Sequence, residues 1–312
     1  MRVVVTGAAG FIGSHLCEKL VADGHMVVGI DIVNGADVGN NLRTLAGAPH
    51  FRFLYGSVGK RLPEVHDADV CFHLAAYVGP AYVKRMVSEM TEDHLDDTLT
   101  VLRWAKRMAA RVVATSSSEV YGDMPAPQRE DSPLHVGPTH IQRSAYAVTK
   151  LAMEHMLLWG LAEHATIARL FNVAGARQRV YGGCVIPVWV SLLHRAQPIV
   201  VHDPEATRCF THVRDAVAAL VGLCETPRAA GTIVNVGQPQ PITMGALADM
   251  VCAHFPGARQ EVQAAQDNMG YGLLRHRQPD VTKMRQTLGW VPRERTAEIV
   301  ADAVAHAKVT LV

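Results

Sequence analysis

The chain has 312 residues, of which 49% are hydrophobic and 19% are charged, and its formal net charge is +1. A chain of this length and composition can bury a sizeable core, and it is too apolar to be intrinsically disordered. Because basic and acidic residues are interspersed, no long-range field favours nucleic acid or an anionic membrane, and we expect neither as a partner.

Apolar, β-branched runs alternate with longer segments of helical period through the first half of the chain. Their hydrophobicity is continuous, which is typical of strands that are buried on both faces of a parallel sheet. The pattern predicts a doubly wound α/β domain. The runs are Val3–Thr6, Met26–Ile30, Val70–Leu74, Val112–Thr115 and Thr166–Leu170.

A glycine-rich turn follows the first of these strands, in the stretch VVVTGAAGFIGSHL. Gly7, Gly10 and Gly13 lie between the strand and a predicted helix. Glycine permits a tight turn and lets a phosphate approach the helix N-terminus, where free N–H groups and the helix dipole favour an anion. The turn therefore predicts a dinucleotide-binding site.

Asp31 closes the second strand, eighteen residues beyond Gly13. A carboxylate at this place can accept hydrogen bonds from both ribose hydroxyls of an adenosine, and it would repel a 2′-phosphate. This favours NAD over NADP. The alternative is a surface aspartate that happens to follow an unrelated glycine turn.

Hydroxyl and carboxylate side chains are concentrated in the stretch TSSSEVYG, Thr115–Gly122. Ser117, Ser118 and Glu119 belong to it. Such a stretch is either a serine-rich turn or part of a reaction centre.

The stretch SAYAVTKLAMEHMLLW predicts a helix in which Tyr146 and Lys150 are four residues apart and therefore lie on one face. A phenol has a pKa of about 10, so using it as a base near neutral pH requires roughly 4 kcal/mol of electrostatic help. A lysine ammonium group and an oxidised nicotinamide are suitable sources. Taken alone, a tyrosine and a lysine at this spacing are usually no more than a pair on a helix surface.

After Arg169 the sequence brings turns and prolines between short strands, and it ends in one more amphipathic helix. We therefore predict a smaller lobe that is interleaved with the sheet domain. The sheet domain would comprise residues 1–175 and about 208–237, and the lobe residues about 176–207 and 238–312.

The chain carries, in this order, the motifs TGAAGFIGSHL, HLAA at His73–Ala76, SSSEVYG, YAVTK, RLFNVAGARQ and RCFTHVRDA, and it closes with RQPDVTKMRQTLGWVP. As a set, these motifs resemble those of the extended short-chain dehydrogenase/reductases, the NAD-dependent sugar epimerase/dehydratase family. The resemblance implies a Rossmann-type domain that holds NAD and a C-terminal lobe that holds a nucleotide diphosphate sugar, with a UDP-sugar favoured. It also implies a homodimer formed through the helices near Leu95–Ala109 and Tyr146–Leu161.

The same resemblance assigns the catalytic residues. Ser117 would hydrogen-bond the sugar hydroxyl that is oxidised, Tyr146 would remove its proton, and Lys150 would hold the nicotinamide ribose. Hydride would then pass from sugar C4 to the nicotinamide.

The resemblance also implies binding residues. The diphosphate or the sugar would be held by Asn172, Arg208 and an arginine at or near Arg275 or Arg277, although for Arg208 a structural ion pair is the alternative. The NAD site would comprise Gly7, Gly10, Phe11, Ile12, Gly13, Asp31, Ser57, Leu74, Ala75, Ala76, Tyr146 and Lys150.

Removal of hydride from C4 would leave a 4-keto sugar, and the residue at position 119 indicates how that sugar reacts next. In simple 4-epimerases of the family this position is typically small or hydroxylic, whereas in 4,6-dehydratases a glutamate removes the C5 proton. Many of those dehydratases have an aspartate where this chain has Ser118. UDP-glucuronate decarboxylases carry a Ser-Glu pair together with an arginine that matches Arg277, which could hold the C6 carboxylate.

This combination narrowly favours decarboxylation after oxidation at C4, with Ser118 and Glu119 among the catalytic residues. The alternatives are a UDP-hexose or UDP-uronate 4-epimerase in which Glu119 is a supporting carboxylate, a 4,6-dehydratase, and a non-catalytic NAD-holding scaffold. A reductase that acts on a non-sugar carbonyl is a further alternative.

Some positions depart from the family pattern. Ser57 stands where an aspartate usually contacts the adenine, His94 stands where an asparagine is usual, and Asp97 replaces a glycine.

The sequence shows no motif for metal binding, secretion or membrane insertion. The six cysteines form no C-x-x-C pair and the histidines no H-E-x-x-H motif, so we expect no metal site. The chain begins with a strand, MRVVV, in place of a secretory leader, and its most apolar window, Val180–Leu193, is too short to span a bilayer. We therefore predict a cytoplasmic protein.

Overall fold

The computed structural model describes residues 1–33, 41–263 and 275–310. Its centre is a seven-stranded parallel sheet of order β11-β6-β5-β4-β1-β2-β3. This arrangement confirms the predicted doubly wound α/β fold. In chain order the strands are β1 (Arg2–Thr6), β2 (Met26–Asp31), β3 (Phe51–Tyr55), β4 (Val70–His73), β5 (Arg111–Ser117), β6 (Ala165–Leu170) and β11 (Thr232–Val236).

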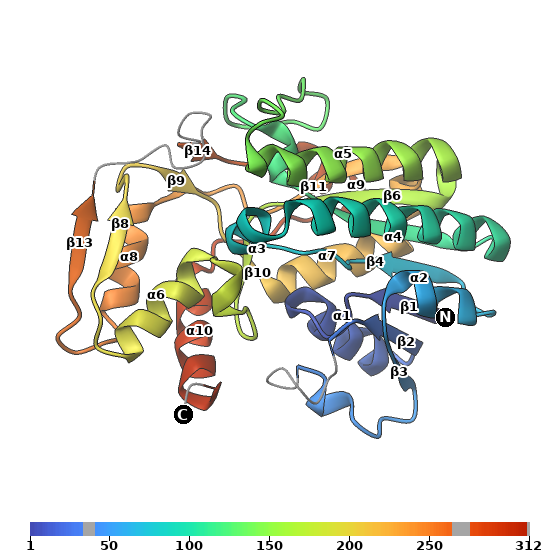
Figure 1. Ribbon diagram of the computed structural model, residues 1–312, viewed down its shortest axis with the longest axis horizontal. Helices are drawn as coiled ribbons and strands as arrows, with labels where there is room; N and C mark the ends of the chain where they lie inside the picture. The colour runs from blue at the N-terminus through green and yellow to red at the C-terminus, as the bar shows by residue number, and fades with distance from the viewer. Residues whose placement is uncertain (34–40, 264–274, 311–312) are drawn as a thin grey trace.

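Helices cover both faces of the sheet (Figure 1). On one face α1 (Phe11–Ala22) and α7 (Val213–Glu225) pack against Val3 and Val5 of β1. On the other face α4 (Val87–Met108) and α5 (Gln142–Leu161) pack against Val4. Successive side chains of a strand point to opposite faces, so β1 contributes to two separate cores.

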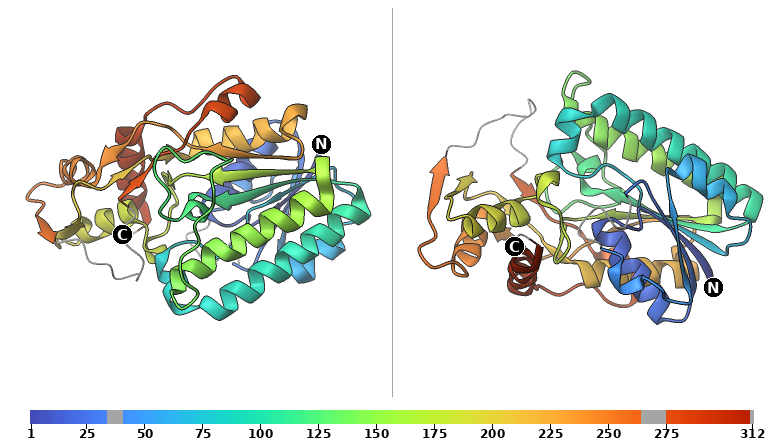
Figure 2. Two further views of the ribbon diagram at one scale, coloured as in Figure 1. Left: turned by 90° about the horizontal axis from the view of Figure 1, so that it is seen from above. Right: turned by 60° about the horizontal axis from the view of Figure 1, so that its bottom comes forward.

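A second part of the molecule lies beyond one end of this sheet and has its own hydrophobic core (Figures 1 and 2). It contains α6 (Val185–His194), α8 (Met244–Cys252), α10 (Thr296–Thr310) and the parallel pair β8 (Ile199–His202) and β13 (Gln260–Gln263). Helix α9 (Thr282–Leu288) instead packs with α7 and β11 on the main sheet.

A small three-stranded sheet brings two arginines together. Its strands are β12 (Ile242–Thr243), β9 (Thr207–Arg208) and β14 (His276–Arg277), in that order. Strands β9 and β14 run parallel, and Arg208 is the register partner of Arg277. Side chains of register partners lie on the same face of a sheet, so the two guanidinium groups belong to one site.

A buried ion pair fixes α5 on the sheet. The Nε and Nη2 atoms of Arg169 on β6 donate to the two carboxylate oxygens of Glu154 on α5, at 2.9 and 2.7 Å. The two side chains are only 2% and 3% exposed. Arg169 also donates to the Tyr121 hydroxyl at 3.0 Å, and that hydroxyl donates to Asn235 at 2.7 Å. The network connects α5, β6 and β11 to the segment that follows β5.

We expect Glu154→Gln to lower the free energy of unfolding by about 3–5 kcal/mol, because it leaves the buried guanidinium of Arg169 without its counter-charge. Urea denaturation followed by circular dichroism measures the change. The control is Asp131→Asn, which breaks the exposed pair between Arg129 and Asp131 and should have no measurable effect. A loss below about 1 kcal/mol in Glu154→Gln would contradict the role given to this pair.

Candidate active site

The glycine turn after β1 is packed against backbone. Gly7 has a φ of +73°, and a Cβ atom on it would lie 2.9 Å from the backbone nitrogen of Ala75. A Cβ atom on Gly13 would lie 2.0 Å from the carbonyl oxygen of Gly7. Helix α1 begins after Gly10 without a side-chain cap or an acidic residue in its first turn. Its N-terminus therefore suits an anion such as a pyrophosphate.

Asp31 is held beside this turn at the end of β2. Its carboxylate oxygens accept hydrogen bonds from the backbone N–H groups of Ala9 and Val33, each at 2.9 Å. Burial raises the pKa of Asp31, and the two N–H groups oppose this rise. The carboxylate is thus fixed at the carboxyl edge of the sheet, where a ribose would be recognised.

The other predicted cofactor residues line the same edge. Phe11 and Ile12 open α1. The N–H groups of Leu74 and Ala75 both donate to the hydroxyl of Thr6 at 3.1 Å, which fixes the chain after β4, where Ala76 follows. Ser57 precedes helix α2 (Val58–Arg61) and makes no side-chain cap bond there.

The predicted catalytic residues are brought together where β5 ends. The Ser117 hydroxyl accepts a hydrogen bond from the N–H group of Glu119 at 3.2 Å and is hydrogen-bonded to the Tyr146 phenol. The Lys150 amine lies 5.9 Å from the centroid of the Tyr146 ring and donates to the carbonyl oxygen of Thr115 at 3.0 Å. Ser117, Tyr146 and Lys150 therefore form one cluster at the edge of the sheet.

The electrostatics of the chain alone do not make Tyr146 a base. Burial raises the pKa of Tyr146 and the charge of Glu119 adds to the rise, whereas the hydrogen bond from Ser117 lowers it. Burial lowers the pKa of Lys150 to about 8. The positive charge that a phenolate requires must therefore come in part from a bound group.

His94 connects the segment after β4 to the helix that carries Tyr146. Its Nε2 atom accepts the Tyr77 N–H group at 2.9 Å, so the proton lies on Nδ1 and is donated to the Thr149 hydroxyl at 3.1 Å. That hydroxyl donates to the Tyr146 carbonyl oxygen at 2.9 Å. Burial, with the charge of Lys150, lowers the pKa of His94 to about 3, so it is neutral at physiological pH.

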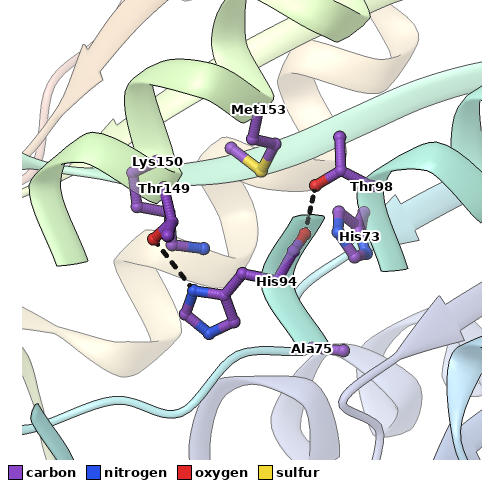
Figure 3. Close-up of a pocket in the computed structure, with 7 residues that line it drawn as sticks. All are labelled: His73, Ala75, His94, Thr98, Thr149, Lys150 and Met153. Atoms are coloured by element: carbon purple, nitrogen blue, oxygen red, sulfur yellow. Dashed lines mark hydrogen bonds between the residues drawn. The ribbon is translucent and has the colours of Figure 1, made fainter. Parts of the chain in front are cut away.

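A narrow cavity with no room for a water molecule lies between α4, α5 and the segment after β4 (Figure 3). His94 and Lys150 both border it, so the imidazole occupies a place next to the reactive residues. The cavity is lined by His73, Ala75, His94, Thr98, Thr149, Lys150 and Met153.

Glu119 is held by two arginines. Arg143 donates from Nε to Oε2 at 2.8 Å and from Nη2 to Oε1 at 2.9 Å. Arg277 donates from Nη1 to the same Oε1 atom and, at 3.3 Å, to the hydroxyl of Ser118. Burial alone would raise the pKa of Glu119, but the charges of Arg277 and Arg143 outweigh it and lower the pKa to about 2. Glu119 is therefore a carboxylate at any physiological pH.

Among the described residues, a third guanidinium group, that of Arg208, lies near Glu119. Burial and the nearby charges of Arg277 and Arg143 lower the pKa of Arg208 to about 10. The Nη2 atom of Arg277 is buried and has no acceptor among the residues that the structure describes. Three guanidinium groups around one carboxylate form a site for further anions.

Of the other residues predicted to bind the substrate, Asn172 lies near the arginine cluster and Arg275 does not join it. The side chain of Asn172 donates to the carbonyl oxygen of Cys209 at 3.3 Å, next to Arg208 in the chain. Arg275 instead pairs with Asp203 at 2.7 and 2.8 Å and is 49% exposed. Of the two arginines left open by the sequence, the structure places Arg277 in the cluster.

Arg143 was not among the residues predicted from the sequence. This residue lies three positions before Tyr146 in α5, and residues at this spacing share a helix face. The spacing was thus a signal that could have placed a second cation next to the phenol.

Two absences hold within the described parts of the chain. Residues 1–33, 41–263 and 275–310 contain no group of three or more His, Cys, Asp or Glu side chains that could hold a metal ion. No helix in these ranges is long and apolar enough to cross a membrane. The cytoplasmic location stays a prediction.

Comparisons with known proteins show the family to which the chain belongs. The model of the NAD dependent epimerase/dehydratase family matches residues 3–237. The chain is 32% identical over 305 residues to UDP-glucuronic acid decarboxylase 6 of Arabidopsis thaliana, with 96% of this chain and 86% of that protein covered. It is 31% identical over 300 residues to UDP-N-acetyl-alpha-D-glucosaminuronate decarboxylase of Bacillus cytotoxicus, with 93% and 92% covered.

Among solved structures, the chain resembles UDP-glucuronic acid 4-epimerase from Bacillus cereus in complex with NAD. The TM-score is 0.86 and the sequence identity 25%, with 99% of each chain covered. The cofactor predicted from the glycine turn and Asp31 is thereby confirmed as NAD.

Replacing the buried amine of Lys150 should stabilise the protein when NAD has been removed. Because burial lowers the pKa to about 8 from its ordinary value of 10.5, protonated Lys150 costs free energy in the folded state. That cost is full below pH 8 and disappears as the pH rises towards 10.5. Lys150→Met should therefore raise the free energy of unfolding at pH 7 by roughly 3 kcal/mol.

The measurement is urea denaturation of both proteins at pH 7 and pH 10. The advantage of Lys150→Met should shrink at pH 10, because the wild-type amine is then largely neutral in the folded state. Equal stability of the two proteins at pH 7 would contradict the interpretation.

Proposed function

The chain belongs to the NAD-dependent epimerase/dehydratase family, and from this premise we propose that its substrate is a UDP-sugar with a carboxylate at C6. It is an NAD-dependent enzyme that acts on a nucleotide sugar, and decarboxylation is the favoured outcome. The observation that carries the proposal is the cluster of Arg143, Arg208 and Arg277 around Glu119.

The charges of this cluster support a substrate with two anionic parts. Three arginines lie near one glutamate among the described residues of this partly buried site, and guanidinium groups recognise carboxylates and phosphates through paired hydrogen bonds. The diphosphate of a nucleotide sugar accounts for one part, at Arg208. A carboxylate on the sugar accounts for the other, at Arg277. The two decarboxylases described above, to which the chain is similar, are named for uronate substrates.

The residues at the carboxyl edge fit NAD. Gly7, Gly10 and Gly13 would receive its pyrophosphate and Asp31 its ribose. NAD bound there would supply the acceptor for the hydride of sugar C4 and the source from which that hydride is returned. The chain supplies the proton transfer: Tyr146 would take the proton of the C4 hydroxyl while Ser117 holds the oxygen.

Once C4 is a ketone, the C6 carboxylate belongs to a β-keto acid. The C5–C6 bond breaks, carbon dioxide leaves, and the electron pair passes into an enolate on the C4 oxygen. Hydrogen bonds from Ser117 and Tyr146 would stabilise that oxyanion. The charge of Glu119 next to the carboxylate disfavours the charged reactant and not neutral carbon dioxide. A proton then adds to C5.

The second candidate is a UDP-uronate 4-epimerase, which is favoured by the likeness to the Bacillus cereus enzyme. Such an enzyme needs the same cofactor and must also accept a sugar with a carboxylate. It differs in that the ketone turns over within the site and keeps its carboxylate.

We expect the protein, incubated with NAD and UDP-glucuronate, to release a product that is lighter by the mass of carbon dioxide. Mass spectrometry with chromatography measures this, with UDP-glucose and UDP-N-acetylglucosamine as neutral controls. Tyr146→Phe should reduce turnover by about 100- to 10,000-fold, because it removes the proton acceptor. An isomer of unchanged mass would identify a 4-epimerase, and turnover of only the neutral sugars would contradict the uronate proposal.

The division of labour between the two parts of the chain is also a proposal. Residues 1–175 and about 208–237 would hold NAD, and the lobe of about 176–207 and 238–312 would hold the nucleotide sugar. The separate core under α6, α8 and α10 supports this division. The small sheet that carries Arg208 and Arg277 would then connect the lobe to the reaction centre.

A homodimer through α4 and α5 is proposed as well. The two helices lie side by side on one face of the molecule (Figure 2). Trp159 and Val148 on α5 are 85% and 46% exposed, and exposed apolar side chains on one helix pair are typical of a protein interface.

We expect Trp159→Arg to convert a dimer into monomers, because it replaces the highly exposed apolar side chain of α5 with a charge. Light scattering coupled to size exclusion chromatography reports the mass. Tyr55→Arg is the matched control, since Tyr55 is 54% exposed on the edge strand β3 and away from both helices. A wild-type protein that is monomeric at micromolar concentration would contradict the proposal.

A further inference from the structure

We propose that Arg143 is a second receptor for the carboxylate of the sugar, and that Glu119 occupies this receptor until the substrate displaces it. The inference rests on the proposed function, because it assumes a substrate with a carboxylate. It goes further by naming a specificity-determining residue and by giving Glu119 a role before any chemistry occurs.

The geometry of Arg143 is that of a carboxylate receptor. Its Nε and Nη2 atoms donate to the two different oxygens of Glu119, at 2.8 and 2.9 Å. Two parallel N–H donors facing two oxygens are the arrangement by which arginine recognises any carboxylate. The pair is accessible to solvent, because the side chains of Arg143 and Glu119 are 27% and 23% exposed. A carboxylate of a ligand could therefore take the place of Glu119.

Arg277 shows that the cluster can accommodate a second carboxylate. Its side chain is only 4% exposed, and its Nη1 atom shares the Oε1 atom of Glu119 with Arg143. Its Nη2 atom is buried without an acceptor among the described residues. One carboxylate thus serves two guanidinium groups and leaves a donor unsatisfied. A buried unsatisfied donor costs about 1–3 kcal/mol, which a second carboxylate would recover.

The position of Arg143 matches the substrate. Arg143 and Tyr146 are three residues apart in α5, which corresponds to about 4.5 Å along the helix axis. In a uronate, C6 is attached to C5, the neighbour of C4. If Tyr146 takes the proton from the C4 hydroxyl, the C6 carboxylate lies within reach of the guanidinium one turn away.

Displacement has a thermodynamic consequence. The substrate carboxylate must compete with Glu119 for the same donors, so part of its interaction energy is offset by the broken contacts of Glu119. Removing the charge of Glu119 should therefore strengthen the binding of a uronate, although Glu119 belongs to the reaction centre. If Glu119 instead held Arg143 and Arg277 in position for the substrate, removing its charge would weaken the binding of a uronate.

The test measures binding by calorimetry to NAD-loaded protein, with Tyr146→Phe as the background that prevents turnover. UDP-glucuronate is the probe, and UDP-glucose is its neutral counterpart. Arg143→Met should weaken the binding of UDP-glucuronate about 10- to 100-fold, the worth of one to two charged hydrogen bonds. The binding of UDP-glucose should change by less than about threefold. Arg143→Lys, which keeps the charge and loses the paired donors, should lie between wild type and Arg143→Met.

Glu119→Gln is the second arm. It should tighten the binding of UDP-glucuronate by about tenfold, because the internal competitor has lost its charge. UDP-glucose should bind as before. If Glu119→Gln weakens the binding of UDP-glucuronate, the displacement of Glu119 is wrong. If Arg143→Met weakens both ligands equally, Arg143 has a structural role and is not a carboxylate receptor.

The two proposals fail differently. If the Tyr146→Phe protein binds UDP-glucuronate no more tightly than UDP-glucose, the uronate substrate is wrong and this inference with it. If that protein prefers UDP-glucuronate and Arg143→Met keeps the preference, only the inference is wrong. Should Arg143→Met fail to fold or to retain NAD, the Arg143→Lys and Glu119→Gln proteins decide the question.

Discussion

The active site depends on one constraint, the convergence of three guanidinium groups on a single carboxylate. Arg143, Arg208 and Arg277 come from α5, β9 and β14, and Glu119 lies just after β5. The net charge of the chain is only +1, so an anionic ligand is not attracted by the protein as a whole. The attraction is local, and the fold places it directly beside Ser117 and Tyr146.

Two arginine–glutamate pairs, each with one member on α5, differ in burial. The more buried pair stabilises the fold, and the more exposed pair lies at the site. Arg169 and Glu154 are 2% and 3% exposed, and Tyr121 satisfies a further donor of Arg169. If a ligand replaced either partner of this pair, the other partner would be left as an unpaired charge in the core. Arg143 and Glu119 are 27% and 23% exposed, and the same chemistry there allows exchange with a ligand.

Sequence patterns predicted the inner strands of the sheet but not its edges. Strands β3 and β11 are the two outermost strands, and their partly exposed side chains lack the continuous hydrophobicity of buried strands. The candidate catalytic residues Ser117, Tyr146 and Lys150, which the structure brings together, could be selected from local motifs. The pairing of Arg208 with Arg277 depends on strand register, which no local pattern shows, so the choice between Arg275 and Arg277 required the structure. Arg143 was accessible from helical spacing alone.

The arginine cluster around Glu119 would also influence whether the 4-keto sugar is decarboxylated or epimerised. An epimerase must turn this ketone over, and a carboxylate held by both Arg143 and Arg277 would have to leave two sets of charged hydrogen bonds before it could turn. Each such bond is worth about 1.5–3 kcal/mol. Loss of carbon dioxide requires the opposite, a sugar whose C5–C6 bond stays aligned with the carbonyl group. Holding the carboxylate at two points therefore favours decarboxylation over rotation, and the charge of Glu119 beside it favours the departure of a neutral product.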